Sequence, residues 1–240
     1  MAQELAVAPH RRPPLSRKRK LLTTALVLLV AATMVGGGLF VQLRRSSPEA
    51  DGYGSARTPA RITAPAAITL GAPSAPHTVD VYEDPLCPYC SQFEHRFGQL
   101  LAKAVDEGKV RVTYHLLTFL DPRSATGTYS TRAAAAMLCA TQENGAAFAP
   151  LHDRLMSLDA QPGENGATDR TDEELTRFAA EAGAGTGVAD CLRNGTYTAV
   201  LRDTTAAVRP TIPGTPAIRL DGKPVDLGNL TDSAWADPLR

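Results

Sequence analysis

The stretch "YEDPLCPYCSQFE", residues 82–94, contains two cysteines separated by two residues, with a proline directly after the first. A Cys-x-x-Cys pair in a protein binds a metal, forms a structural disulfide or exchanges electrons by thiol–disulfide chemistry. The compartment bears on this choice, because disulfides persist outside the cytoplasm and are rare inside it. The sequence upstream of the pair indicates the compartment.

That upstream sequence has the pattern of a membrane anchor. Residues 21–43 carry no charge over 23 residues, enough for a helix to cross a hydrocarbon core of about 30 Å. Six Lys or Arg precede the segment in "HRRPPLSRKRK". By the positive-inside rule, residues 1–20 lie in the cytoplasm and the rest of the chain lies outside. We expect a single-pass anchor in the cell membrane, with a cleaved signal peptide as the alternative.

Residues 44–66 are rich in Pro, Gly, Ser and Ala and predict a disordered linker, so the folded domain is expected over residues 67–240. Residues 1–66 contain ten Lys or Arg and three Asp or Glu, whereas residues 67–240 contain fifteen and twenty-two. The domain is therefore acidic, which argues against nucleic acid as a partner.

The periodicity of residues 77–119 predicts a strand, a helix and a second strand. "HTVDVYED" alternates as a strand does, and "KVRVTYHLLTF" after Gly108 has the same character. Between them, one apolar stripe has helical spacing: Phe93, Phe97, Leu100, Leu101 and Ala104. This order predicts a right-handed βαβ unit with parallel strands.

The rest of the domain is predicted to be a block of helices followed by a β-hairpin. The helical block covers about residues 126–208 and includes a capping box from Thr171 to Glu174. The hairpin, "TPAIRLDGKPVDLG", turns at Asp221-Gly222, and Pro224 confines its second strand to a sheet edge. The fold class is α/β.

The two cysteines of the motif are predicted to have different roles. Pro88 suits the first turn of a helix, which places Cys87 at the helix N-terminus. Free N–H groups and the helix dipole stabilise an anion there, so the Cys87 thiolate is favoured and acts as the nucleophile. Cys90 lies one turn further along and would be the resolving thiol.

Metal binding and a purely structural bridge are the alternatives for this pair. Structural zinc sites commonly use a second Cys-x-x-Cys or spaced histidines, whereas Cys139 and Cys191 are single residues in helical sequence. His77 and His95 are expected to be solvated. A structural disulfide is possible, although a strand-to-helix turn is an unusual place for one. We expect redox exchange and no metal site.

The order of strand, Cys-Pro-x-Cys helix, strand, helical insertion and Thr-Pro before a hairpin resembles the DsbA-like thiol oxidoreductases. The likeness is to membrane-tethered forms of Gram-positive and actinobacterial type and covers about residues 68–230. It implies a thioredoxin-like fold with an inserted helical subdomain, here preceded by one transmembrane helix. It also implies that Thr215 and Pro216 form a cis peptide bond facing the active site, where a substrate segment binds.

The resemblance also bears on the other two cysteines and on partners. Related proteins have a second disulfide that pins the insertion, which implies a structural bridge between Cys139 and Cys191, with a second catalytic pair as the alternative. It implies no dissociable cofactor, since the cysteine pair is the redox centre. The implied partners are exported cysteine-containing proteins and a membrane quinone-linked reoxidase.

Three positions depart from the family pattern. The dipeptide Pro-Tyr between the cysteines also occurs in glutaredoxins, so strong oxidising power does not follow from it. Val81 stands where relatives often have a buried acid, and Glu83 and Asp84 are expected to be surface carboxylates rather than proton acceptors for Cys90. The segment after the hairpin is short for a closing helix, and Trp235 is expected to pack on the core.

The sequence thus predicts an extracytoplasmic thiol–disulfide oxidoreductase that introduces disulfides into exported proteins. A reductase or isomerase, for example in cytochrome maturation, is the first alternative. The second is a non-enzymatic, membrane-tethered Cu(I) chaperone, for which thiolates are suitable ligands, although no Met or His accompanies the motif in sequence.

Overall fold

The computed structural model of the protein describes residues 54–228 and 233–240. The predicted cytoplasmic tail, the membrane anchor and the first part of the linker lie outside these residues. Within the described ranges, no helix combines the length and the apolar character needed to cross a membrane.

A six-stranded sheet runs through the domain in the order β1-β2-β4-β3-β5-β6. Its strands are β1 Arg61–Ala64, β2 Ala67–Leu70, β3 His77–Glu83, β4 Val110–Leu116, β5 Ala217–Leu220 and β6 Lys223–Pro224. The central strands β3 and β4 are parallel and are joined through helix α2, Pro88–Asp106. This confirms the predicted βαβ unit, and every other neighbouring pair is antiparallel.

Helix α2 packs along the sheet because its apolar residues recur every three or four positions. Phe93, Phe97 and Leu101 are at most 2% exposed. The ring of Trp235 lies 6.2 Å from that of Phe93 and 5.1 Å from that of Phe97, measured between centroids. Trp235 therefore packs on the core as expected, from the short 3-10 helix Ala234–Leu239 at the end of the chain.

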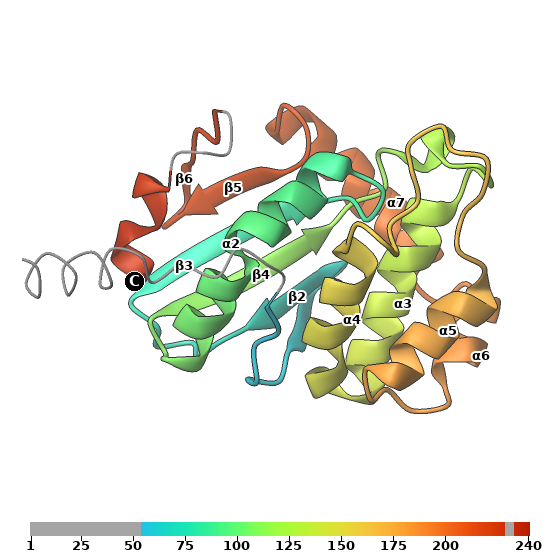
Figure 1. Ribbon diagram of the computed structural model, residues 1–240, viewed down its shortest axis with the longest axis horizontal. Coiled ribbons are helices and arrows are strands. Elements are labelled where there is room, and N and C mark those ends of the chain that lie inside the picture. The colour runs from blue at the N-terminus through green and yellow to red at the C-terminus, as the bar shows by residue number, and fades with distance from the viewer. Residues whose placement is uncertain (1–53, 229–232) are drawn as a thin grey trace, which may run out of the picture. The chain divides into compact units, whose positions relative to one another are not determined.

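The predicted helical block is present and gathers beside the sheet (Figure 1). Its helices are α3 Tyr129–Glu143, α4 Phe148–Met156, α5 Asp172–Glu181, α6 Val188–Arg193 and α7 Thr198–Val208. The α5 capping box is confirmed, since Thr171 accepts from the Glu174 N–H while the Glu174 carboxylate accepts from the Thr171 N–H. Helix α3 is the centre of the block because its run of buried alanines lets the neighbouring helices approach closely.

The folded domain begins earlier than the sequence indicated. Residues 61–64, which were assigned to the linker, form strand β1, which pairs with the fully buried strand β2. The Asp106 carboxylate accepts hydrogen bonds from the backbone N–H groups of Arg57 and Thr58. The composition of this region resembles that of a flexible linker. It is nevertheless ordered, because β2 pairs with β4 and β1 can then pair with β2.

The C-terminal hairpin turns where predicted. Asp221 and Gly222 have φ values of 49° and 75°, and a two-residue hairpin turn of type I′ needs positive φ at both positions. Pro224 lies in the exposed edge strand β6, where its missing N–H breaks no ladder hydrogen bond.

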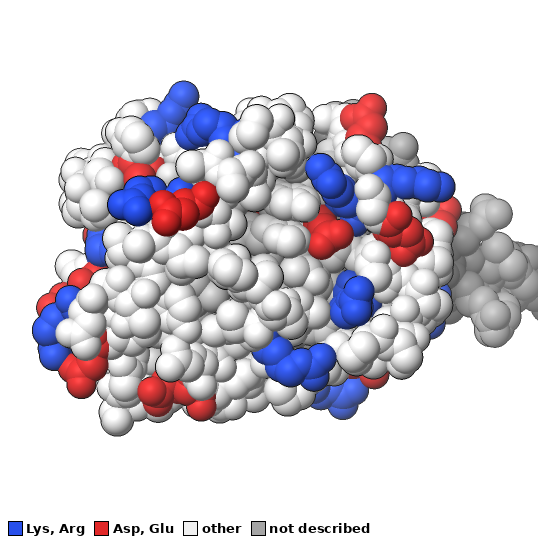
Figure 2. Space-filling model, turned by 180° about the vertical axis from the view of Figure 1, so that it is seen from behind, with Lys and Arg blue, Asp and Glu red and all other residues white. Residues whose placement is uncertain are grey.

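Acidic and basic side chains are mixed over the surface. On the face seen in Figure 2, Lys and Arg alternate with Asp and Glu around a centre that carries neither. A basic stripe that could follow a phosphate backbone is not seen on this face, in keeping with the acidic composition of the domain.

Candidate active site

Cys87 is the N-cap residue of α2, and its turn follows directly from the end of β3. Its backbone is extended, with φ −74° and ψ 116°, and Pro88 occupies the first turn. The N–H groups of Cys90 and Ser91 donate to the Cys87 carbonyl at 3.1 and 3.2 Å. A side chain at this position lies where the helix dipole stabilises negative charge.

The Cys87 sulfur faces the loop before β5. Cys87 and Cys90 are free thiols in this structure, and each is at most 3% exposed. The Cys87 thiol donates to the carbonyl oxygen of Thr215 at 3.3 Å. The Thr215-Pro216 peptide bond is cis. The fold therefore brings together four residues singled out in the sequence, from two segments about 125 residues apart.

The surroundings of Cys87 favour its thiolate. A hydrogen bond from the Cys90 thiol lowers the pKa of Cys87, and burial opposes this. The Thr215 side chain and the N–H groups of Cys90 and Tyr89 add to the lowering, which brings the pKa from 9.0 to about 6. At neutral pH, Cys87 is therefore mainly the thiolate, the form that attacks and leaves in disulfide exchange.

We expect the thiolate absorbance of the reduced protein to titrate with a midpoint near pH 6, because Cys87 ionises first. The measurement is absorbance at the thiolate band against pH, with Cys87→Ser as the control that should lack this step. A midpoint at or above about 8, the range of an ordinary thiol, would contradict the nucleophile assignment.

Cys90 has the opposite character. Burial raises the pKa of Cys90 well above its ordinary value, and the hydrogen bond to Cys87 and the negative charges of Cys87 and Glu83 add to this. Its sulfur therefore holds its proton while Cys87 is ionised. This asymmetry matches the predicted division between an attacking and a resolving thiol.

The two carboxylates before the motif are buried, and the expectation that they lie on the surface was wrong. Asp84 is 0% exposed and Glu83 is 1% exposed. Asp84 accepts from the N–H groups of Leu86 and Leu120 at 2.9 Å and from the Ser130 hydroxyl at 2.6 Å. Burial nevertheless raises the pKa of Asp84 to about 7, against the lowering effect of these donors. Asp84 thus ties the active-site turn to the helical insertion.

Two residues of the insertion that the sequence did not single out contact the motif. Met156 is fully buried and packs against Cys87 and Cys90, so a methionine does accompany the motif in space. The Gln161 amide donates to the carbonyls of Pro85 at 3.0 Å and Cys87 at 3.1 Å. The sequence pattern near the motif does not indicate these two contacts, because both residues lie about 70 residues after the motif in the chain.

Cys139 of α3 and Cys191 of α6 form a disulfide in the structure, with their Cα atoms 6.1 Å apart. Cys139 is buried at the centre of the helical block, and Cys191 is half-buried at its side. The two residues are not in the cluster formed by Cys87, Cys90 and Met156.

Comparison with known proteins gives one family and several similar structures. A family described as thioredoxin matches residues 63–237. Oxidised DsbA of Mycobacterium tuberculosis is 33% identical, with a TM-score of 0.60 over 67% of this chain and 85% of that one. Reduced DsbG of the same organism, a disulfide bond oxidoreductase by its description, is 34% identical, with a TM-score of 0.58 over 65% and 76%.

A similar sequence also occurs within a larger protein. Serine/threonine-protein kinase PknE of Mycobacterium tuberculosis is 39% identical over 129 residues, which are 53% of this chain. The matching part spans only 23% of the length of the kinase. The likeness therefore concerns one part of that protein.

Proposed function

The chain belongs to the thioredoxin family and is a DsbA-like thiol–disulfide oxidoreductase, and from this premise we propose that it introduces disulfides into exported proteins at Cys87 and Cys90. The observation that carries the proposal is the difference between the two thiols: the pKa of Cys87 is lowered to about 6 and that of Cys90 is raised. The proposed compartment is extracytoplasmic, supported by the charge pattern around residues 21–43.

The exchange proceeds in two steps from the oxidised enzyme. A substrate thiolate attacks the Cys87 sulfur, the Cys87–Cys90 bond breaks, and Cys90 leaves and takes up a proton. A second substrate thiolate then attacks the substrate sulfur of the mixed disulfide, and Cys87 leaves as a thiolate. The substrate loses two electrons and two protons; the enzyme gains both electrons and one proton, which binds Cys90, and the other proton goes to solvent. The low pKa of Cys87 favours the second step because a more stable thiolate leaves faster.

Thr215 and Pro216 are proposed to hold the substrate segment beside Cys87. The Thr215 carbonyl lies 3.3 Å from the Cys87 sulfur, and both residues are half-buried. Backbone groups next to a cis proline can pair with an extended peptide as a strand would. Tyr89, whose side chain is 61% exposed, offers apolar surface next to the motif. A membrane quinone-linked reoxidase is proposed to restore the Cys87–Cys90 disulfide.

The direction of the reaction is tested by the stability of the two redox forms. The pKa of Cys87 is lower in the folded reduced protein than in the unfolded chain, so ionisation of Cys87 stabilises the folded reduced form. This stabilisation is complete at pH values above the unfolded pKa and is lost as the pH falls through about 6. At pH 7 the Cys87 thiolate contributes about 1.4 kcal/mol, equivalent to about 30 mV. We expect the reduced protein to melt about 3–6 °C above the oxidised form at pH 7, with the gap widening towards pH 9.

The measurement is thermal melting of both forms from pH 5.5 to 8.5, with the Cys139–Cys191 disulfide intact, together with the potential of the Cys87–Cys90 couple. The Pro-Tyr dipeptide between the cysteines leads us to expect a potential between that of thioredoxin, about −270 mV, and that of the strongest oxidants, about −120 mV. A more stable oxidised form with a potential below about −250 mV would instead support the reductase alternative.

A further inference from the structure

Three ionisable side chains lie close together in the buried core of the domain. They are Glu83 at the end of β3, Glu94 in α2 and His152 in α4, and none is more than 2% exposed. One nitrogen or oxygen atom of each lies within 4.8 Å of those of the other two. The disulfide exchange described above uses neither Glu94 nor His152.

The hydrogen bonding of this cluster is incomplete. His152 Nε2 and Glu83 Oε1 are 2.8 Å apart. Glu83 Oε2 and Glu94 Oε1 are buried and have no hydrogen-bond partner among the described residues. Buried carboxylate oxygens are nearly always paired or bound to a metal, because removing them from water is costly. Two orphaned oxygens on side chains of one cluster therefore point to a missing cation.

Without a metal ion, protons neutralise the cluster, and a proton on Glu94 can also bridge the two carboxyl groups. Burial raises the pKa of Glu94 to about 8. Burial lowers the pKa of His152, but Glu83 and Glu94 outweigh this and raise it to about 9. The other titratable groups near this cluster are Asp153 and Tyr114, and neither side chain can carry a positive charge. Binding of the ion releases the protons of Glu94 and His152, and the two carboxylates then carry two negative charges that a divalent cation balances.

We propose that Glu83, Glu94 and His152 bind a divalent transition-metal ion, with Zn²⁺ as the best match. One imidazole nitrogen and two carboxylate oxygens form a borderline donor set of the kind that zinc accepts at about 2.0–2.2 Å. Ca²⁺ and Mg²⁺ require six or more oxygen ligands, which this cluster does not provide. The ligand atoms lie within 4.8 Å of one another, and they must approach to about 3.4 Å of one another to share an ion held at about 2.0–2.2 Å.

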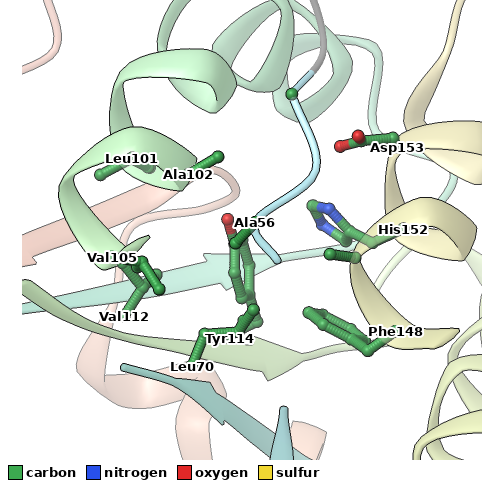
Figure 3. Close-up of a pocket in the computed structure, with 12 residues that line it drawn as sticks. Ala56, Leu70, Leu101, Ala102, Val105, Val112, Tyr114, Phe148, His152 and Asp153 are labelled. Carbon is green, nitrogen blue, oxygen red and sulfur yellow. The ribbon is translucent and has the colours of Figure 1, made fainter. Parts of the chain in front are cut away.

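A small pocket lies beside His152, which is the one residue of the three that lines it. It has a volume of about 20 Å³, and its lining includes Tyr114, Phe148, His152 and Asp153 (Figure 3). The labelled His152 ring lies between Phe148 and Asp153. A space of this size holds about one water molecule. Three protein ligands and one water complete a four-coordinate zinc site.

The test uses the full chain with Cys87 and Cys90 joined in a disulfide, so that the thiols cannot bind the metal. Zn²⁺ is titrated against a chromophoric chelator, and melting is followed with and without excess Zn²⁺. We expect one Zn²⁺ per chain and a rise in Tm of several degrees, because an ion that binds only the folded state stabilises it. Ca²⁺ and Mg²⁺ should give no such rise.

Glu94→Gln tests the ligand assignment because glutamine has nearly the same shape but no charge. This variant should bind Zn²⁺ at least about tenfold more weakly, while its metal-free Tm stays equal or rises. Glu181→Gln, at an exposed position of α5, is the matched control and should bind like the unaltered chain.

Two results would overturn the proposal. One is a stoichiometry of zero for the oxidised chain, and the other is unchanged affinity in Glu94→Gln. If Glu94→Gln fails to fold, the stoichiometry of the unaltered oxidised chain still decides. None of these outcomes depends on disulfide exchange, so failure here leaves the proposed function intact.

Discussion

Replacing Cys87 by serine is expected to reduce disulfide exchange to the uncatalysed rate, a loss of at least about a thousandfold, since removing an enzyme's nucleophile has effects of this size. The reason is that Cys87 is the sulfur with the stabilised thiolate and the contact with Thr215. The measurement is the rate at which the oxidised full chain oxidises a dithiol peptide.

Cys90→Ser is the matched variant and should behave differently. Its Cys87 thiolate should attack a substrate disulfide, release one substrate thiolate and stay bonded to the other sulfur, because the Cys90 thiol that would resolve this mixed disulfide is absent. The mixed disulfides are counted by non-reducing gel and mass spectrometry. If Cys87→Ser trapped substrates and Cys90→Ser did not, the two roles would be reversed.

The second large effect is on stability. Removing the Cys139–Cys191 disulfide in the double variant Cys139→Ala, Cys191→Ala should lower the free energy of unfolding by up to about 4 kcal/mol, the loop-closure estimate for residues 52 apart. The Tm should fall by about 8–16 °C. Exchange at Cys87 should stay within about twofold, because neither Cys139 nor Cys191 contacts the motif.

Mild reduction provides the control for that variant. Dithiothreitol at low concentration should open the Cys87–Cys90 disulfide first and leave the Cys139–Cys191 bond closed, since the stabilised Cys87 thiolate is a good leaving group. Alkylation and peptide mapping distinguish the two. Loss of turnover without loss of stability in the double variant would show that this pair takes part in catalysis.

Much of the fold follows from short-range patterns. The alternation in β3 and β4 and the apolar stripe of α2 predict the βαβ unit because each element buries one regular face. Strands β1 and β2 lack such a signal. Each has only four residues, and pairing of β2 with β4 and of β1 with β2 makes them part of the sheet.

The predicted site was incomplete for a similar reason. Helix α2 puts Glu94 four residues after Cys90 and seven before Leu101, which places it on the buried face. His152 lies four residues after Phe148 in the same way. Both positions had a signal in their spacing. Met156 and Gln161 had none, because their contact with the motif depends on how the insertion folds back.

The two edges of the sheet affect whether unfolded chains can aggregate with this protein. In the proposed role, the substrates still lack their disulfides and are unfolded, and an open sheet edge is a template to which such chains can add a strand. Strand β1 has four residues and an irregular register, and β6 has two residues and ends in Pro224. Such short, irregular edges are poor templates for strand addition. In the proposed role, these edges would let the protein meet unfolded substrates without seeding their aggregation.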